Sequence, residues 1–167
     1  MRVACNASPL IWLSHTGHFS LLQALFEVVL IPPEVRAETV ERARGYPNAE
    51  TVRTACEAGW MVVVPPNDAA RVTVLRAQLH AGEAETLVMA AEQGVDAVLV
   101  DDDLRARNFA MVMGLRVIGT AGILLLAHDQ GMSVDVKSTL DDMRSRGFRL
   151  ADSVYQAILQ RMSDEDT

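Results

Sequence analysis

The chain has 167 residues, half of them hydrophobic, and its 15 Lys and Arg against 22 Asp and Glu give a formal net charge of −7. This length predicts one domain, and the composition excludes disordered and low-complexity proteins. The apolar runs are far shorter than the ~18–20 residues of a membrane-spanning helix, and no signal-peptide pattern begins the chain, so we expect a cytoplasmic protein that does not enter a membrane.

Short β-branched runs alternate with helical stretches along the whole chain. In chain order we predict a strand over 2–5, helices from 8 and over 19–26, a strand over 28–31, helices over 33–42 and 49–58, a strand over 60–64, helices over 68–79 and 82–93, a strand over 97–100, a helix ending at 113, a strand over 115–118, and helices over 120–129, 134–146 and 152–161. Pro and Gly at most of the junctions favour these boundaries.

Continuous apolar strands between helices are typical of a parallel sheet that is covered on both faces. We therefore expect an α/β fold of three layers, with a central parallel sheet of four or five strands. We expect one domain over residues 1–160 and a flexible acidic tail over 161–167. Such sheets bind ligands at the carboxyl ends of their strands.

Acidic and amide side chains gather at that predicted edge. They are Asn6 after the first strand, Glu38 on the helix after the second, Glu83 and Glu85 at the start of the helix before the fourth, and Asp101, Asp102 and Asp103 directly after the fourth. Crowded carboxylates repel one another unless a cation lies between them, and Mg²⁺ or Mn²⁺ prefers such oxygen ligands. The alternative for each residue is a helix cap, which is a common place for Asp.

Five segments in order resemble the PIN domain family, in the branch of PIN-like nucleases paired with small antitoxins. They are Val3-Ala4-Cys5-Asn6-Ala7-Ser8-Pro9-Leu10, Leu30-Ile31-Pro32-Pro33-Glu34-Val35-Arg36-Ala37-Glu38, Ala81-Gly82-Glu83-Ala84-Glu85-Thr86-Leu87, 98–107 and 117–124. The resemblance implies a divalent-metal-dependent endoribonuclease, the toxin of a toxin–antitoxin pair. It also implies RNA as substrate, a small antitoxin as partner and, in many relatives, a homodimer.

The resemblance also implies about four acidic positions. Three of them match Asn6, Glu38 and Glu83, with Glu85 as a neighbour of the third. The fourth lies within 101–103, where Asp103 is preferred and Asp102 is a further metal ligand. These residues would hold Mg²⁺ or Mn²⁺.

The chain departs from the family pattern at position 6, where Asn replaces the expected Asp. An Asn oxygen can bind a metal but brings no negative charge, so we expect weaker metal binding. Three explanations stay open: a natural pseudo-nuclease, a weakened enzyme, or an engineered change that silences a toxic activity. The alternative function is therefore a catalytically inactive RNA- or protein-binding module.

Other residues give weaker signals. The triple Asp is also compatible with a phosphatase that uses an aspartyl nucleophile, but Arg105 stands where Thr or Val is expected. His15 and His18 have the spacing of a metal pair without a Cys partner nearby, and a zinc site there is disfavoured. Trp12 and Trp60 lie in apolar runs and are expected in the core.

Overall fold

The computed structural model describes residues 1–101 and 104–165. It divides into two compact units, residues 1–120 and 121–167, and each unit is described separately. The expectation of a single domain over 1–160 stays a prediction. Asp102 and Asp103 lie outside the described residues.

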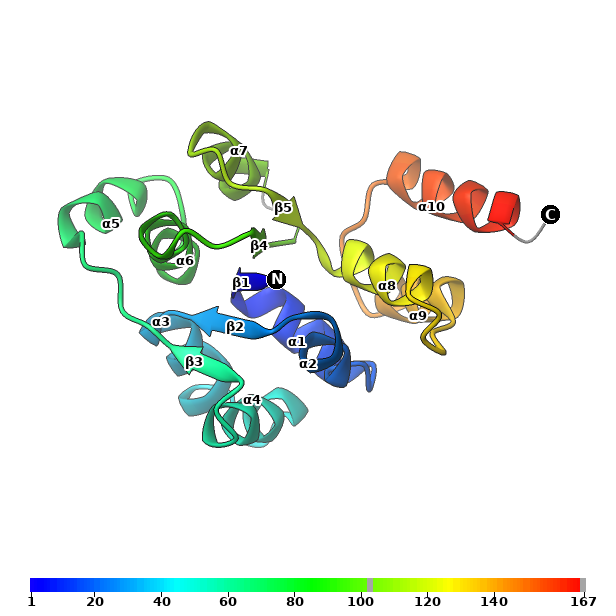
Figure 1. Ribbon diagram of the computed structural model, residues 1–167, viewed down its shortest axis with the longest axis horizontal. Helices are drawn as coiled ribbons and strands as arrows, with labels where there is room; N and C mark the ends of the chain where they lie inside the picture. Colours follow the sequence, from blue (N-terminus) through cyan, green and yellow to red (C-terminus); the bar gives the residue numbers. More distant parts are fainter. Residues whose placement is uncertain (102–103, 166–167) are drawn as a thin grey trace. The chain divides into compact units, whose positions relative to one another are not determined.

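The first unit is built on a five-stranded sheet in the order β3-β2-β1-β4-β5, and all of its pairings are parallel. Its strands are β1 (Arg2–Cys5), β2 (Val28–Ile31), β3 (Met61–Val63), β4 (Ala97–Leu99) and β5 (Val117–Ile118). The expected α/β architecture with a central parallel sheet is confirmed (Figure 1). The first two strands have the predicted bounds, and the other three are shorter than predicted.

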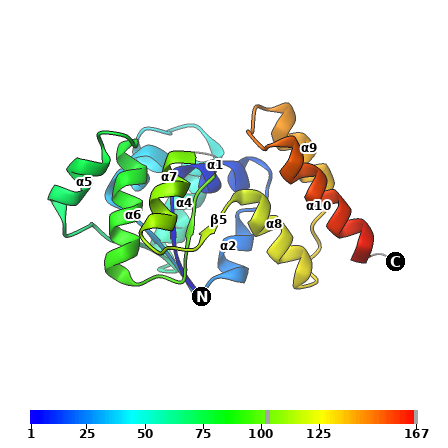
Figure 2. The same ribbon diagram turned by 90° about the horizontal axis from the view of Figure 1, so that it is seen from above.

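Helices join the strands of this unit in order. They are α1 (Ala7–His15), α2 (Ser20–Leu25), α3 (Pro33–Arg36), the π-helix η1 (Ala37–Glu41), α4 (Pro47–Glu57), α5 (Ala69–Leu75), α6 (Ala81–Gln93) and α7 (Leu104–Val112). Right-handed crossovers put the helices between β1 and β3 on one face and those after β3 on the other. In agreement, α1 contacts α4 and η1, whereas α6 contacts α5 and α7 (Figures 1 and 2).

The sheet register sorts the strand side chains between the two faces. Ala4 pairs with Leu30 on β2 and with Val98 on β4, and all three lie in one buried cluster with Leu87 and Val88 of α6. Adjacent strand residues point to opposite faces, so the strands of this sheet are apolar on both sides. The carboxyl ends of β1 and β4 are thereby held side by side.

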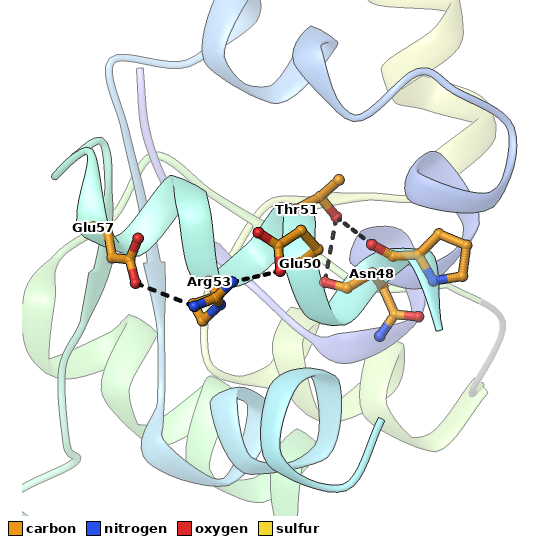
Figure 3. A network of polar contacts seen from close by, with 6 residues as sticks. Asn48, Glu50, Thr51, Arg53 and Glu57 are labelled. Atoms are coloured by element: carbon orange, nitrogen blue, oxygen red, sulfur yellow. Dashed lines mark hydrogen bonds and ion pairs between the residues drawn. The ribbon is translucent and has the colours of Figure 1, made fainter. Parts of the chain in front are cut away.

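The helix α4 packs against η1. The amide of Asn48 donates to the backbone oxygen of Thr39 in η1 at 2.8 Å, and both residues are buried. Arg53 of α4 is exposed and pairs with Glu50 and Glu57, whereas the Thr51 hydroxyl contacts the Ser14 hydroxyl of α1 and backbone oxygens of the preceding turn of α4 (Figure 3). Exposed ion pairs of this kind add little stability, so the buried amide contact is what fixes η1.

The second unit consists of helices. They are α8 (Thr120–Asp129, whose first residue belongs to the first unit), α9 (Val136–Ser145) and α10 (Asp152–Glu165). The hydroxyl of Tyr155 donates to Asp141, the Arg144 guanidinium lies 4.4 Å from the Tyr155 ring centroid, and Arg161 pairs with Asp129 at 2.6 Å. None of the helices in the described part of the chain combines the length and apolar character needed to cross a membrane.

Candidate metal centre

A pocket of about 220 Å³ opens at the carboxyl edge of the sheet in the first unit. Its lining comes from the start of α1, from η1 and from the start of α6, and comprises Asn6, Ala7, Ser8, Ile11, Trp12, Glu38, His80, Gly82 and Glu83. The strand order reverses between β1 and β4, and parallel sheets bind ligands at such a switch point. Three of the residues expected at the site from sequence, Asn6, Glu38 and Glu83, thus line one pocket.

Asn6 holds the first position of this pocket. It follows β1, its backbone N–H donates to the Leu99 oxygen of β4 at 3.0 Å, and it is the N-cap residue of α1. Asn is a favoured capping residue, yet here its side chain makes no capping hydrogen bond. Instead its Oδ1 atom lies 3.4 Å from the point where a Cβ atom of Gly82 would stand. The buried amide is therefore turned into the pocket.

Glu38 reaches the same point from η1. Its Oε2 atom lies 3.4 Å from the Cβ position of Gly82, the same distance as the Asn6 oxygen. The π-helical turn of η1 adds one residue to the helical repeat, and such turns are frequent at functional sites. Partial burial raises the pKa of Glu38, and the nearby Glu34 charge adds to this, whereas Arg42 and His80 oppose it.

Glu83 lies in the first turn of α6 and is buried. Its Oε2 atom accepts a hydrogen bond from the His80 backbone N–H at 3.0 Å, which closes the turn before the helix. The neighbouring Glu85 has a different partner: its Oε2 accepts from the Glu34 N–H at 3.0 Å, at the start of α3. Glu85 therefore ties two helices together, and Glu83 is the α6 carboxylate that lines the pocket.

Asp101 follows β4 and serves as a structural link. Its carboxylate accepts hydrogen bonds from the Ser8 hydroxyl at 2.7 Å and from the backbone N–H and hydroxyl of Thr120 at 2.6 and 2.8 Å. Burial raises the pKa of Asp101, and these hydrogen bonds together with the charge of Arg107 oppose the shift. Asp101 thus joins the chain after β1 to the chain after β5. The expected fourth acid, Asp103, and Asp102 lie outside the described residues.

The oxygen donors of the pocket fit a hard divalent cation. Asn6 Oδ1 and Glu38 Oε2 both border the point that a Cβ atom at position 82 would occupy, and Glu83 adds a second carboxylate to the lining. Oxygen-only donors are the ligands of Mg²⁺ and Mn²⁺. Within residues 1–101 and 104–165, no three His, Cys, Asp or Glu side chains gather as a complete ligand set, and the amide at position 6 is not among those residue types.

Several features of the site were not expected from sequence. Gly82, which was predicted as the first residue of a helix, leaves space beside Asn6 and Glu38 because it has no Cβ atom. Trp12 and Trp60 are only partly buried, so their assignment to the core was wrong. Trp12 lines the pocket, whereas the ring of Trp60 packs against Phe19 at 5.7 Å between centroids.

The chain was compared with models of protein families. A family model described as a PIN domain covers residues 2–164, nearly the whole sequence. No curated protein matches the chain. PIN domains are generally nucleases that use divalent metals, which agrees with the fold and with the donors in the pocket. The chain belongs to the PIN domain family.

Proposed function

We propose that the chain is a divalent-metal-dependent endoribonuclease whose activity is reduced by Asn6. The observation that carries this proposal is that Asn6 Oδ1 and Glu38 Oε2 each lie 3.4 Å from one point, the Cβ position of Gly82, with Glu83 in the same pocket. When bound there, Mg²⁺ or Mn²⁺ would supply an activated water and would stabilise the leaving oxygen in phosphodiester cleavage.

The residues of the chain have separate tasks in this proposal. Glu38 and Glu83 supply negative charge to hold the cation, and Asn6 supplies a neutral oxygen. Asp101 holds Ser8 and Thr120 in place, so it fixes the turn that carries Asn6. Asp103 is proposed as the fourth acid.

A neutral donor at position 6 also favours a second candidate function. With one fewer charge the pocket holds a cation less tightly, and a protein of this kind can act as an RNA- or protein-binding module without catalysis. The two functions differ in the response to Asn6→Asp, which restores the acid expected in the family. An inactive module with a decayed site gains nothing from this change.

The proposal is tested by cleavage of a fluorogenic single-stranded RNA with Mn²⁺ and with a chelator. We expect slow metal-dependent cleavage by the native chain, faster cleavage by Asn6→Asp and loss of cleavage by Glu38→Gln in either background. Glu57→Gln, at an exposed acid on α4 outside the pocket, is the matched control and should cleave like the native chain (Figure 3). If neither the native chain nor Asn6→Asp cuts RNA, the nuclease proposal fails.

The toxin role and the small antitoxin partner are further parts of the proposal, and they rest on the resemblance of the five sequence motifs. Expression of Asn6→Asp in a bacterial host tests them. We expect growth arrest that Glu38→Gln abolishes and that a short reading frame adjacent to the gene relieves. Normal growth with an Asn6→Asp protein that cleaves RNA in vitro would contradict the toxin role.

A further inference from the structure

The part of the pocket that comes from α1 includes large apolar side chains, although carboxylates line the same pocket. The helix α1 buries Leu10 and Leu13, and it presents Ser8, Ile11 and Trp12 as a partly exposed face. These three positions are spaced i, i+3 and i+4, so they lie on one side of the helix. All three line the pocket together with Glu38 and His80. Trp12 is therefore a partly exposed residue beside the proposed site of phosphodiester cleavage.

The charge of the protein makes this ring important for binding. Proteins usually hold nucleic acid through Lys and Arg at the phosphates. Here the net charge is −7, and the described residues of the pocket lining include two carboxylates and no Lys or Arg. Phosphate attraction by side chains is thus unfavourable at this site. Stacking of a base on an aromatic ring needs no positive charge, and it tolerates any base because every base has a π-face.

The pocket also restricts which nucleic acid can use this ring. In a duplex, neighbouring bases cover both faces of each base, so no face is free for a protein side chain unless the base is extruded. Single-stranded RNA exposes its bases and is commonly recognised by stacking on Trp, Tyr, Phe or His. A pocket of about 220 Å³ with one aromatic wall suits a single base and not a stacked pair of strands.

We propose that Trp12 is the stacking platform for one unpaired base of single-stranded RNA, next to the site of phosphodiester cleavage proposed at Asn6, Glu38 and Glu83. Ile11 extends the apolar contact along α1, and His80 borders the base from the start of α6. This inference rests on the proposed function, and it assigns to Trp12 the selection of unpaired over duplex substrate. Trp12 touches the substrate in this account but takes no part in bond cleavage.

The two tryptophans of the sequence provide a direct test. Trp60 precedes β3, at the amino ends of the parallel strands, whereas Trp12 lines the pocket at their carboxyl ends. Trp60→Phe leaves Trp12 as the sole indole, and Trp12→Phe leaves Trp60. In buffer with Ca²⁺, we expect a short single-stranded oligoadenylate to quench the fluorescence of Trp60→Phe and to leave Trp12→Phe unchanged. The duplex with oligouridylate should quench neither variant.

Binding of the labelled oligoadenylate, followed by fluorescence anisotropy, gives the second readout. Trp12→Leu should weaken binding by about tenfold or more, whereas Trp12→Phe should stay within about threefold of the native chain because it keeps an aromatic ring. Trp60→Phe is the matched control and should bind like the native chain. Thermal melting of each variant confirms that it is folded. Native-like binding by Trp12→Leu, equal quenching by duplex and single strand, or no binding of RNA by any variant overturns the inference.

The outcomes separate this inference from the nuclease proposal. If Asn6→Asp shows metal-dependent cleavage and its Trp12→Leu version binds and cleaves RNA equally well, only the stacking role fails. If no form cleaves RNA but binding and quenching depend on Trp12, the nuclease proposal fails and the base site stands, as in the binding-module alternative.

Discussion

Gly82→Ala is expected to separate the stability of the fold from the function of the site. The added methyl carbon would stand 3.3 Å from Val35 Cγ2 and 3.4 Å from both Asn6 Oδ1 and Glu38 Oε2. Gly82 lies at the start of α6 and has no positive φ, so Ala can adopt its backbone conformation. The methyl group would therefore be placed in contact with both oxygens without unfolding the helix.

The two effects of this change have opposite signs. Ala in place of Gly favours a helix by up to about 1 kcal/mol, and the tight contacts offset part of this gain. We therefore expect a melting temperature equal to or slightly above that of the native chain. A bound Mg²⁺ needs oxygens at about 2.1 Å in near-octahedral arrangement, and the methyl group occupies that space. By comparison with other disturbances of metal ligands, we expect Mn²⁺ affinity and RNA cleavage to fall about 10- to 100-fold.

The assay is cleavage of the fluorogenic RNA over a range of Mn²⁺ concentrations, made in the Asn6→Asp background, with thermal melting of the same samples. Ala91→Gly, near the far end of α6, is the inverse control. It should lower the free energy of unfolding by about 0.5–1 kcal/mol and leave cleavage unchanged. If Gly82→Ala binds Mn²⁺ and cleaves RNA as well as its parent, the space between Asn6 and Glu38 is not the metal site.

Three further outcomes follow from the polar contacts around the pocket. Thr120→Val keeps the side-chain shape but removes one hydroxyl donor to buried Asp101. The free energy of unfolding, measured with urea, should therefore fall by about 1–3 kcal/mol. An unchanged unfolding midpoint would contradict the linking role of Asp101. Because burial raises the pKa of Asp101 in the folded chain, its contribution to stability is greatest below the ordinary value of 3.8 and falls as the pH rises through the raised value. The difference between the unfolding midpoints of the native chain and Asp101→Asn should therefore fall as the pH rises across that window. A difference that rises instead would mean that the pKa of Asp101 is lowered and not raised. Glu85→Ala removes the acceptor for the Glu34 N–H, so it should lower the melting temperature and leave Mn²⁺ affinity unchanged, whereas loss of Mn²⁺ binding would make Glu85 a ligand.

The sheet was predictable because its strands are short, apolar and separated by clear breakers. The strands over 2–5 and 28–31 are bounded by polar residues or by Pro, and their predicted bounds agree with the structure. The predicted strand over 115–118 is shorter in the structure, since only Val117 and Ile118 pair with β4. β5 lies at the edge of the sheet, where pairing is available on one side only.

The candidate site was predictable in location but not in its details. The rule for parallel sheets placed Asn6, Glu38 and Glu83 at one edge, and all three line one pocket. The roles of neighbouring acids depend on partners that are distant in the sequence. The Asp101 carboxylate accepts hydrogen bonds from Ser8 and Thr120, which are 93 and 19 residues away along the chain.

The position of Trp12 also depends on tertiary structure. Its neighbours in sequence are apolar, which favours burial, but the helix carries apolar residues on both its buried and its partly exposed side. Periodicity alone does not tell which side of such a helix faces a pocket. The packing of α1 against α4 and η1 decides this, and it leaves Ile11 and Trp12 in the same pocket as the carboxylates.

The central claim is that side chains from the start of α1, from η1 and from the start of α6 jointly hold one divalent cation. Titration of Mn²⁺ into the native chain, Asn6→Asp and Glu38→Gln, followed by the loss of the free-ion electron paramagnetic resonance signal, tests it most directly. The account predicts tighter binding by Asn6→Asp and weaker binding by Glu38→Gln, because ligand charge sets the affinity of such sites. Equal Mn²⁺ affinity in all three proteins would contradict it.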